Sequence, residues 1–406
     1  MTEQVQPLDG VVVLDFTQVM LGPCATQVLG DFGADVIKIE KPGSGDLSRT
    51  SFRADGGEHD PIFWSLNRNK RSVVLNTRDE QGKQAVLALA RKADVVVSNF
   101  RPGVMERMGF GYEALAKENP RLIWAQGTGF GDSGPYRHKG GQDILAQAYS
   151  GVMYRRPDPD DEFKIYATTM GDFSAGMHLV QGILLALLAR ERSGRGQKVD
   201  VSLYDSMLSA QMQEACMQLN RGFEVNWGAM PLSGVFPTTD GALVMVGAFK
   251  ENPLRDISIA LELTEDLSER PDLATLELQI AAKPELQQIF RERFATNTTE
   301  YWMARLEGQD LLSAPVQQLA EALADEQTAV NGMIVEIGSD PQGRPMRAVA
   351  SPVHLSATPA RVRHRPPRLG EHTDEVLAEL LGEGDADGGA GPAGGREQVA
   401  DAAARV

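Results

Sequence analysis

Short apolar runs alternate with longer amphipathic stretches over the first 130 residues. The runs at 11–16, 36–40, 73–75, 95–97 and 122–125 are mostly apolar, which is typical of strands buried on both faces of a parallel sheet. Helix-length stretches, such as about 78–93, separate them. This order predicts βαβ units and an α/β fold with a doubly wound, Rossmann-like sheet. Residues 197–203 predict one further strand.

A long apolar helix is predicted to start near Asp172 and to stop at Ser193-Gly194, where a small residue follows a basic turn. Asp172 would be at or near the N-cap, where free N–H groups and the helix dipole favour an ionised carboxylate. Capping the helix is the commonest role of an Asp in this place, whereas an ionised carboxylate that is uncrowded between Gly171 and Gly176 also suits a nucleophile. The local pattern leaves both roles open.

The second half of the chain has a different character. Residues 204–219 predict a helix, 235–246 a β-hairpin around Asp240-Gly241, and 252–308 several charged helices. We therefore expect a large domain over 1–225 and a small α+β domain over 226–325. Residues 333–337 and 347–349 predict paired strands. The Gly-, Ala- and Asp-rich tail over 383–406 is predicted to be disordered.

Composition excludes several classes of protein. The net charge of −16 over 406 residues argues against a general nucleic-acid binder. Two cysteines, Cys24 and Cys216, and six histidines without ligand spacing predict neither a disulfide framework nor a metal site. The polar N-terminus has no signal core, and the apolar run at 182–189 is too short to span a bilayer. We expect a cytoplasmic protein without a membrane or nucleic-acid partner.

Basic residues follow or precede the predicted strands. Lys41 follows the second strand, Lys70 and Arg71 precede the third, and Arg101 and Arg107 follow the fourth. Ligands of an open parallel sheet bind beyond the carboxyl ends of its strands, so Lys41, Arg101 and Arg107, which would gather there, predict an anionic, phosphate-bearing ligand. Solvated surface charge is the alternative. The GxGxxG, GxxxxGK[ST] and GxSxG motifs are absent.

A series of motifs in a fixed order resembles the class III CoA-transferases, the family of formyl-CoA:oxalate and crotonobetainyl-CoA:carnitine transferases (CaiB/BaiF type). The resemblance covers about residues 8 to 380. The motifs are Leu8-Asp9-Gly10-Val11, Gly22-Pro23, residues 30–40, Asn69-Lys70-Arg71-Ser72, Asn99-Phe100-Arg101-Pro102-Gly103, Gly171-Asp172, residues 193–197 and Leu369-Gly370-Glu371-His372-Thr373.

The resemblance implies an interlocked, ring-like homodimer in which residues 326–382 return to the large, CoA-binding domain. It implies that Asp172 is the catalytic nucleophile, which carries CoA as an aspartyl thioester between an acyl-CoA and a free carboxylic acid. No cofactor is implied beyond coenzyme A as co-substrate. The implied CoA-binding residues are Val19, Met20, Lys41, Asn99, Phe100 and Arg107.

Three departures from family patterns bear on the reaction. Met20 stands where the formyl-CoA transferase has a Gln, and that enzyme's small-domain glycine loop is absent near 230–247. Both weaken an oxalate/formate assignment. Gln142 stands where the related α-methylacyl-CoA racemases have a catalytic His, and an amide cannot act as a general base. A racemase-like isomerase and a catalytically silent acyl-CoA-binding protein remain the alternatives.

The acceptor acid is predicted from the segment before Asp172. Arg155 and Arg156 are candidates for binding the distal carboxylate of a dicarboxylic acid such as succinate, and Gln142 is a third candidate substrate-binding residue. A solvated loop, in which the arginines face the acidic residues at 158–161, is the alternative.

Overall fold

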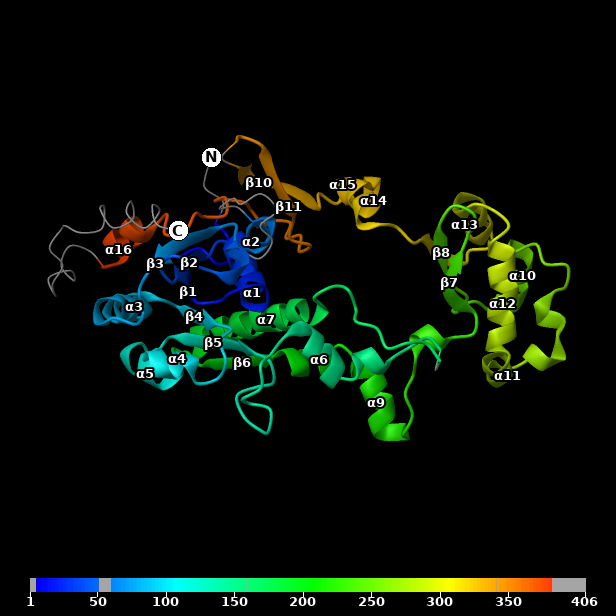
Figure 1. Ribbon diagram of the computed structural model, residues 1–406, viewed down its shortest axis with the longest axis horizontal. Coiled ribbons are helices and arrows are strands. Elements are labelled where there is room, and N and C mark those ends of the chain that lie inside the picture. Colours follow the sequence, from blue (N-terminus) through cyan, green and yellow to red (C-terminus); the bar gives the residue numbers. More distant parts are fainter. Residues whose placement is uncertain (1–4, 51–59, 159, 341, 382–406) are drawn as a thin grey trace, which may run out of the picture. The chain divides into compact units, whose positions relative to one another are not determined.

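The computed structural model describes residues 5–50, 60–158, 160–340 and 342–381 (Figure 1). The chain forms two compact units. Unit 1 takes the described residues of Met1–Ala146, Thr169–Met207 and Met333–Val406, and unit 2 takes those of Gln147–Thr168 and Leu208–Gly332. The tail predicted over 383–406 lies outside the described residues.

The core of unit 1 is a six-stranded sheet in which every neighbouring pair is parallel. The strand order β3-β2-β1-β4-β5-β6 is that of a Rossmann-like doubly wound sheet, as predicted. The strands are β1 (Val12–Asp15), β2 (Asp35–Glu40), β3 (Lys70–Val74), β4 (Val95–Ser98), β5 (Ile123–Thr128) and β6 (Lys198–Ser202).

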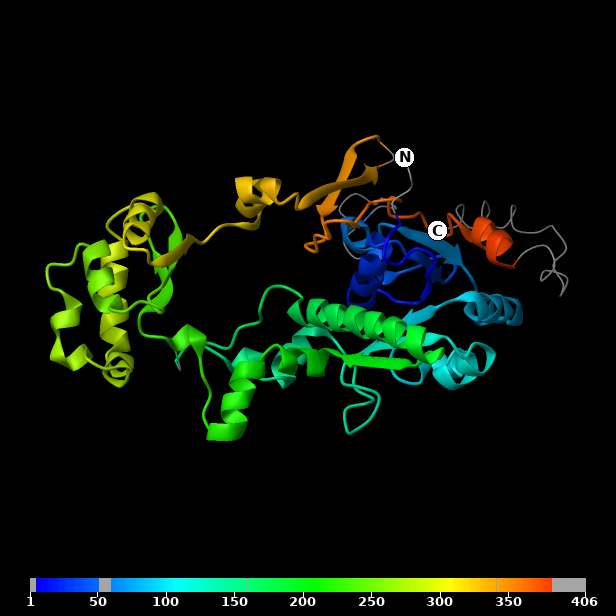
Figure 2. The same ribbon diagram turned by 180° about the vertical axis from the view of Figure 1, so that it is seen from behind.

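Alternation along the strands directs side chains to the two faces of this sheet. Leu14, Phe16 and Ile37 join a core cluster with residues of α3 (Glu80–Lys92), α5 (Tyr112–Glu118) and α16 (Thr373–Leu381). Asp15 and Lys38 point to the other face. That face is covered by α1 (Leu21–Asp31) and by α7 (Met170–Ser193), the long green helix of Figure 2, which pack against each other.

Helix α7 is long and apolar enough to cross a membrane by length and composition, the one such helix in the described ranges. Its inner side packs on β5, β6 and α1 instead. Leu179 and Ile183 are fully buried there, whereas Leu185 and Leu188 on its outer side are 67% and 57% exposed. An apolar helix with one unpartnered side is typical of a protein that buries more surface on assembly.

Lys70 and Arg71 were expected to precede the third strand. In the structure they form the start of β3. The Lys70 ammonium is buried 3.1 Å from Asp15, also fully buried, and it donates to the Pro23 carbonyl of α1. Burial lowers the pKa of Lys70 to about 8, although Asp15 opposes that shift. Arg71 pairs with Asp35, Glu375 and Glu379. These cations therefore hold the fold together and are not free to bind phosphate.

Asn69 ties the C-terminal segment to this region. Its backbone is left-handed (φ 59°), a conformation that Asn tolerates better than most residues. Its side-chain oxygen accepts from the backbone amides of Arg363 and His364, and its side-chain nitrogen donates to Asp31 and to the Arg361 carbonyl. The Asn-Lys-Arg-Ser motif is thus structural in this chain.

The described ranges contain further α-helices. They are α2 (Pro61–Leu66), α4 (Val104–Met108), α6 (Asp143–Tyr149), α8 (Leu203–Ser209), α9 (Met212–Arg221), α10 (Pro253–Ala260), α11 (Leu276–Ala281), α12 (Lys283–Phe294), α13 (Thr299–Gly308), α14 (Leu319–Ala324) and α15 (Glu326–Val330). The helix predicted over 204–219 is two helices, α8 and α9, and the boundary between the two units falls within α8, after Met207.

Unit 2 contains an antiparallel sheet in the order β7-β8-β9, with bounds Ser233–Pro237, Ala242–Val246 and Leu312–Pro315. The hairpin predicted at Asp240-Gly241 joins β7 to β8. Phe236, Phe290, Phe294 and Trp302 form the centre of its core. The hairpin β10 (Ile334–Ser339) and β11 (Pro345–Val349), also predicted, belongs to unit 1.

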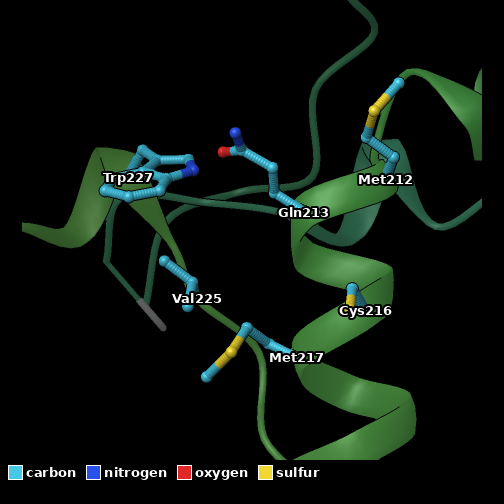
Figure 3. A pocket seen from close by; sticks show the side chains of 6 residues that line it. All are labelled: Met212, Gln213, Cys216, Met217, Val225 and Trp227. Atoms are coloured by element: carbon cyan, nitrogen blue, oxygen red, sulfur yellow. The ribbon is translucent and has the colours of Figure 1, made fainter.

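Unit 2 begins earlier in the chain than the boundary expected at 226. Residues 147–168 belong to it because they pack on α9 and the chain that follows: Arg155 pairs with Glu214 and Glu224, and Gln211 donates to the Ser150 carbonyl. An open apolar groove of about 550 Å³ lies beside α9 (Figure 3). It is lined by Met212, Gln213, Cys216, Met217, Val225 and Trp227.

Candidate active site

The candidate site lies in unit 1, at the carboxyl edge of the parallel sheet. From β1 the chain continues to β2 and β3 on one side of the sheet and then crosses to β4 on the other side of β1. The neighbouring strands β1 and β4 are therefore the topological switch point, where doubly wound sheets bind ligands. Helices that follow parallel strands begin at the same edge. The starts of α1 and α7 therefore meet there, and α7 brings Asp172.

Asp172 is the third residue of α7, whose N-cap is Thr169, so it lies in the first turn, close to the predicted position. Its backbone amide donates to the Asp143 carboxylate at 3.0 Å. Asp143 is itself 93% buried by its neighbours, with 7% of its surface exposed. A second carboxylate thus occupies the helix start that Asp172 was expected to cap.

The sequence predicted an uncrowded Asp172 carboxylate, but in the structure this carboxylate is closely surrounded. Burial, and then the nearby Asp143 charge, raise its pKa from 3.8 to about 6, while a hydrogen bond from the Leu21 backbone amide lowers it in part. The start of a helix favours the anion, but desolvation and a like charge outweigh that here. Asp172 is therefore mostly ionised only above about pH 6.

The two glycines near Asp172 make room for neighbouring parts of the chain. A Cβ atom on Gly176 would lie 2.8 Å from the Leu21 carbonyl oxygen, so glycine is required for α7 to pack this closely on α1. A Cβ on Gly171 would lie 3.0 Å from an Asp143 carboxylate oxygen. The absence of a side chain at Gly171 and Gly176 therefore lets α7 pack closely on Asp143 and α1 on either side of Asp172.

Val19 and Met20 lie in the loop between β1 and α1. Val19 is 43% exposed and adopts a left-handed backbone (φ 67°), which is rare for a β-branched residue. Met20 is the N-cap residue of α1, and its sulfur accepts a hydrogen bond from the Thr169 hydroxyl at 3.1 Å. This bond holds Met20 against Thr169, the N-cap residue of α7, three residues before Asp172 in the chain.

Asn99 and Phe100 follow β4, the strand next to β1. The Asn99 amide nitrogen donates to the Gln18 carbonyl at 2.7 Å, and its oxygen accepts from the Gln18 amide at 2.9 Å. Both polar atoms of this predicted CoA contact therefore hold the β1–α1 loop. Phe100 packs against the core cluster and remains half-buried.

The other predicted contacts are exposed on the same edge. Lys41 directly follows β2, and Arg107 lies on α4, which follows β4. Neither is ion-paired with a residue in the described part of the chain. Gln142, just before α6, is exposed, whereas its neighbour Asp143 is buried.

Arg155 and Arg156 belong to unit 2 and already have partners there. Arg155 lies 3.5 Å from Glu214 and 3.3 Å from Glu224. Arg156 donates to the Asp161 carbonyl and stacks on the Phe163 ring, 4.4 Å from its centroid. Arg156 pairs with no carboxylate of the described residues, so it is the freer cation of the two.

The sequence-based prediction missed Asp143, Asp46 and the Leu21 amide. Asp143 stands in the Gly141-Gln142-Asp143 segment, where Gln142 alone received a role. Asp46 lies in a polar loop and accepts from the Val19 amide. Nothing in a linear pattern indicates such side-chain-to-backbone contacts across 27 or more residues.

The site supports covalent chemistry on a carboxylate. Asp172 is partly desolvated, and its pKa of about 6 lies close to neutral pH. It also faces the Leu21 N–H at the start of α1. These are properties of a carboxylate nucleophile. No group of three potential metal ligands occurs among the residues that the structure describes.

Comparisons with known proteins cover most of the chain. The sequence model of CoA-transferase family III matches residues 8–373. The succinyl-CoA:glutarate CoA-transferase of Mus musculus is 34% identical, with 93% of this chain and 87% of that protein aligned. The formyl-CoA:oxalate CoA-transferase of Rhodopseudomonas palustris (strain TIE-1) is 33% identical over 93% and 94% of the two chains.

The fold has solved counterparts. The crystal structure of a CaiB/BaiF family protein from Brucella suis superposes with a TM-score of 0.82 at 31% identity, covering 93% of this chain and all of that one.

We expect the Asp143→Asn substitution to lower the pKa of Asp172 from about 6 by about one unit. The Asn oxygen can still accept the Asp172 amide hydrogen bond, while the repelling charge is removed. A ¹³C NMR titration of aspartate carboxyl carbons measures the shift, and the Asp172→Asn variant identifies the resonance. An unchanged titration would show that Asp143 does not act on the Asp172 carboxylate.

Stability provides an independent check of the same shift. The folded pKa of Asp172 lies above its ordinary value of 3.8, so the ionised group weakens folding above about pH 6, and this effect vanishes below about pH 4. Asp172→Asn should therefore stabilise the chain at pH 8 by on the order of 2 kcal/mol and should not do so at pH 4.

Proposed function

The chain belongs to CoA-transferase family III, and from this premise we propose that it transfers CoA from an acyl-CoA to a free carboxylic acid through an aspartyl-CoA thioester on Asp172. The observation that carries the proposal is the Asp172 carboxylate itself. It is half-buried at the switch point of the sheet, with its pKa raised to about 6 and the Leu21 amide beside it.

The reaction follows from exchange between activated acyl bonds. The Asp172 carboxylate attacks the thioester carbonyl of the donor, which gives a mixed anhydride and CoA thiolate. The thiolate attacks the Asp172 carbonyl carbon, releases the donor acid and leaves the aspartyl-CoA thioester. The acceptor carboxylate then attacks this thioester, and the returning thiolate forms the new acyl-CoA and frees Asp172.

Each step replaces one activated acyl bond by another, so the proposed chemistry uses no cofactor beyond CoA as co-substrate. Attack at the Asp172 carbonyl places negative charge on its oxygen. The Leu21 amide, which meets the carboxylate in the free protein, is suited to stabilise that oxyanion. The raised pKa also makes Asp172 a stronger nucleophile than an ordinary aspartate.

The CoA moiety would lie along the carboxyl edge of β2, β1 and β4. Lys41 and Arg107, both exposed there, are proposed to pair with its phosphates. Val19 and Phe100 offer apolar surface, and Met20 contacts Thr169 at the start of the Asp172 helix. Asn99 would contribute indirectly, by holding Gln18.

The site favours transfer over the isomerase alternative. Gln142 is an amide in the position of the racemase base, and the neighbouring Asp143 carboxylate is engaged by the Asp172 amide. Proton exchange at an α-carbon would leave no covalent adduct, and neither would silent CoA binding.

We propose a dicarboxylic acid on at least one side of the exchange. Both relatives described above carry names with dicarboxylates, glutarate or oxalate as acceptor and succinyl-CoA as one donor. Arg156 is the better candidate for the second carboxylate, because Arg155 already faces two glutamates. Gln142, which is exposed beside Asp143, is proposed as a further substrate-binding residue.

We further propose that the chain acts as an interlocked homodimer in the cytoplasm. The support lies in each unit separately: Leu185 and Leu188 of α7 are exposed in unit 1, and the groove beside α9 opens to solvent in unit 2. Surfaces of this kind are typical of assembled proteins. Cys24 and Cys216, both free thiols, fit a reducing compartment.

Incubation with succinyl-CoA should add the mass of CoA, less one water, to the intact chain, with the label on the peptide that contains Asp172. Asp172→Asn should abolish the adduct and slow transfer by about 10³-fold or more. Asp205→Asn, which changes an exposed carboxylate on α8, is the matched control and should keep it. An adduct that persists in Asp172→Asn would exclude this mechanism.

In a screen of acceptors with succinyl-CoA, glutarate, malate and oxalate should exceed butyrate and acetate in kcat/KM by about tenfold, the effect of one charge-assisted contact. Arg156→Gln should reduce the preference, and Arg156→Lys should preserve part of it. Preference for the monocarboxylates in the unsubstituted protein would refute the dicarboxylate proposal.

Light scattering should give about twice the 44.1 kDa mass of the chain. Because threaded chains cannot separate without unfolding, tagged and untagged subunits should not exchange on mixing until both are denatured and refolded together. A monomeric mass, or free exchange under native conditions, would contradict an interlocked dimer.

A further inference from the structure

The loop from Thr17 to Met20 contains the least favourable backbone conformation near the site. Val19 has φ 67°, and its branched side chain disfavours that region far more than glycine or asparagine would. Residues in such conformations persist only where the surroundings determine them fully, and they cluster at functional sites. The contacts that hold Val19 are therefore informative.

Three side chains from other parts of unit 1 hold this loop, and we refer to them as the loop clamp: Lys38, Asp46 and Asn99. Lys38 donates to the Thr17 carbonyl at 2.8 Å. Asn99 bonds both the amide and the carbonyl of Gln18. Asp46 accepts from the Val19 amide at 3.1 Å. Three consecutive residues thus have their peptide groups fixed by side chains.

The clamp is itself built from buried charge. Lys38 and Asp46 form a 2.8 Å ion pair whose side chains are 1% and 0% exposed. Burial alone would lower the pKa of Lys38, but Asp15 and then Asp46 outweigh it and raise the pKa. Lys38 pairs with Oδ2 of Asp46, whereas Oδ1, which accepts from the Val19 amide, also accepts from the amide and hydroxyl of Ser48. The carboxylate therefore cannot turn away from Val19 without losing these bonds.

The loop leads directly to the start of α1. Met20 is its N-cap residue and Leu21 its first residue, and the Leu21 amide meets the Asp172 carboxylate. The direction of the first N–H groups of α1 depends on the backbone of Val19. A relaxed Val19 would move the Leu21 amide relative to Asp172.

We propose that Asp46, oriented by Lys38, is a positioning residue that keeps Val19 in its left-handed conformation and so holds the Leu21 amide against the Asp172 carboxylate. The proposal deepens the proposed function and rests on it. Asp46 touches neither the reacting atoms nor, by this account, CoA; it acts through the loop.

The test uses the full chain in a background that lacks the clamp charges, Lys38→Met with Asp46→Ala. Changing both avoids an unpaired buried ion, and Asp15 keeps Lys70 as its partner. Val19→Gly or Val19→Ala is then added. Gly adopts positive φ freely and Ala does not, although both remove the valine side chain. The readout is the single-turnover rate of adduct formation from succinyl-CoA on Asp172, with circular dichroism to confirm folding.

The double-variant background should form the adduct about tenfold or more slower than the unsubstituted chain. Val19→Gly should restore most of that rate and Val19→Ala should not. An unchanged rate in the background, or equal effects of Gly and Ala, would overturn the proposal while leaving Asp172 chemistry intact. No adduct in the unsubstituted chain would instead overturn the proposed function, and this proposal with it.

A second measurement applies even where the double-variant background does not fold. In the otherwise unchanged chain, Val19→Gly should melt at a higher temperature than Val19→Ala, the reverse of the usual order of these residues, because only glycine relieves a positive φ. A lower melting temperature for the glycine variant would show that Val19 is not held in a disfavoured conformation, and would overturn the proposal.

Discussion

The structure of unit 1 depends on charges buried between the sheet and helix α1. Asp15 pairs with Lys70, and Asp46 pairs with Lys38; all four groups are almost wholly removed from water. Ions in such places are costly unless every one has partners. Here each has them, and the partners come from β1, β2, β3 and the loop after β2. The network therefore fixes how these segments join at the edge where the site lies.

This explains why the site is assembled from backbone groups as much as from side chains. The buried network ends on the Thr17 carbonyl and the Val19 amide, and Asn99 holds the residue between them. On the other side, Asp143 holds the Asp172 amide. The two helix starts that meet at Asp172 are each fixed by a carboxylate from another segment. Local propensity cannot supply that precision, because a helix start alone is free to fray.

The repeating elements could be predicted from the sequence, whereas the contacts that make the site could not. Apolar runs mark the strands because a parallel sheet is buried on both faces, and the end of α7 at Gly194 follows local rules. Lys70 misled the prediction, since a lysine inside a buried strand is understood only once Asp15 is opposite. Asp143 and Gly176 act through contacts over 29 residues and over about 150 residues, for which a linear pattern has no signal.

The environment of Asp172 balances opposing effects rather than maximising one. A helix start and the Leu21 amide would give an anion too stable to be a good nucleophile, whereas burial beside Asp143 alone would give a neutral acid without nucleophilicity. Together they leave the pKa at about 6, so that the carboxylate is charged at neutral pH and still more basic than usual. Asp143 can exert this influence only as a buried acceptor of the Asp172 amide, which explains why it is enclosed while the adjacent Gln142 remains exposed.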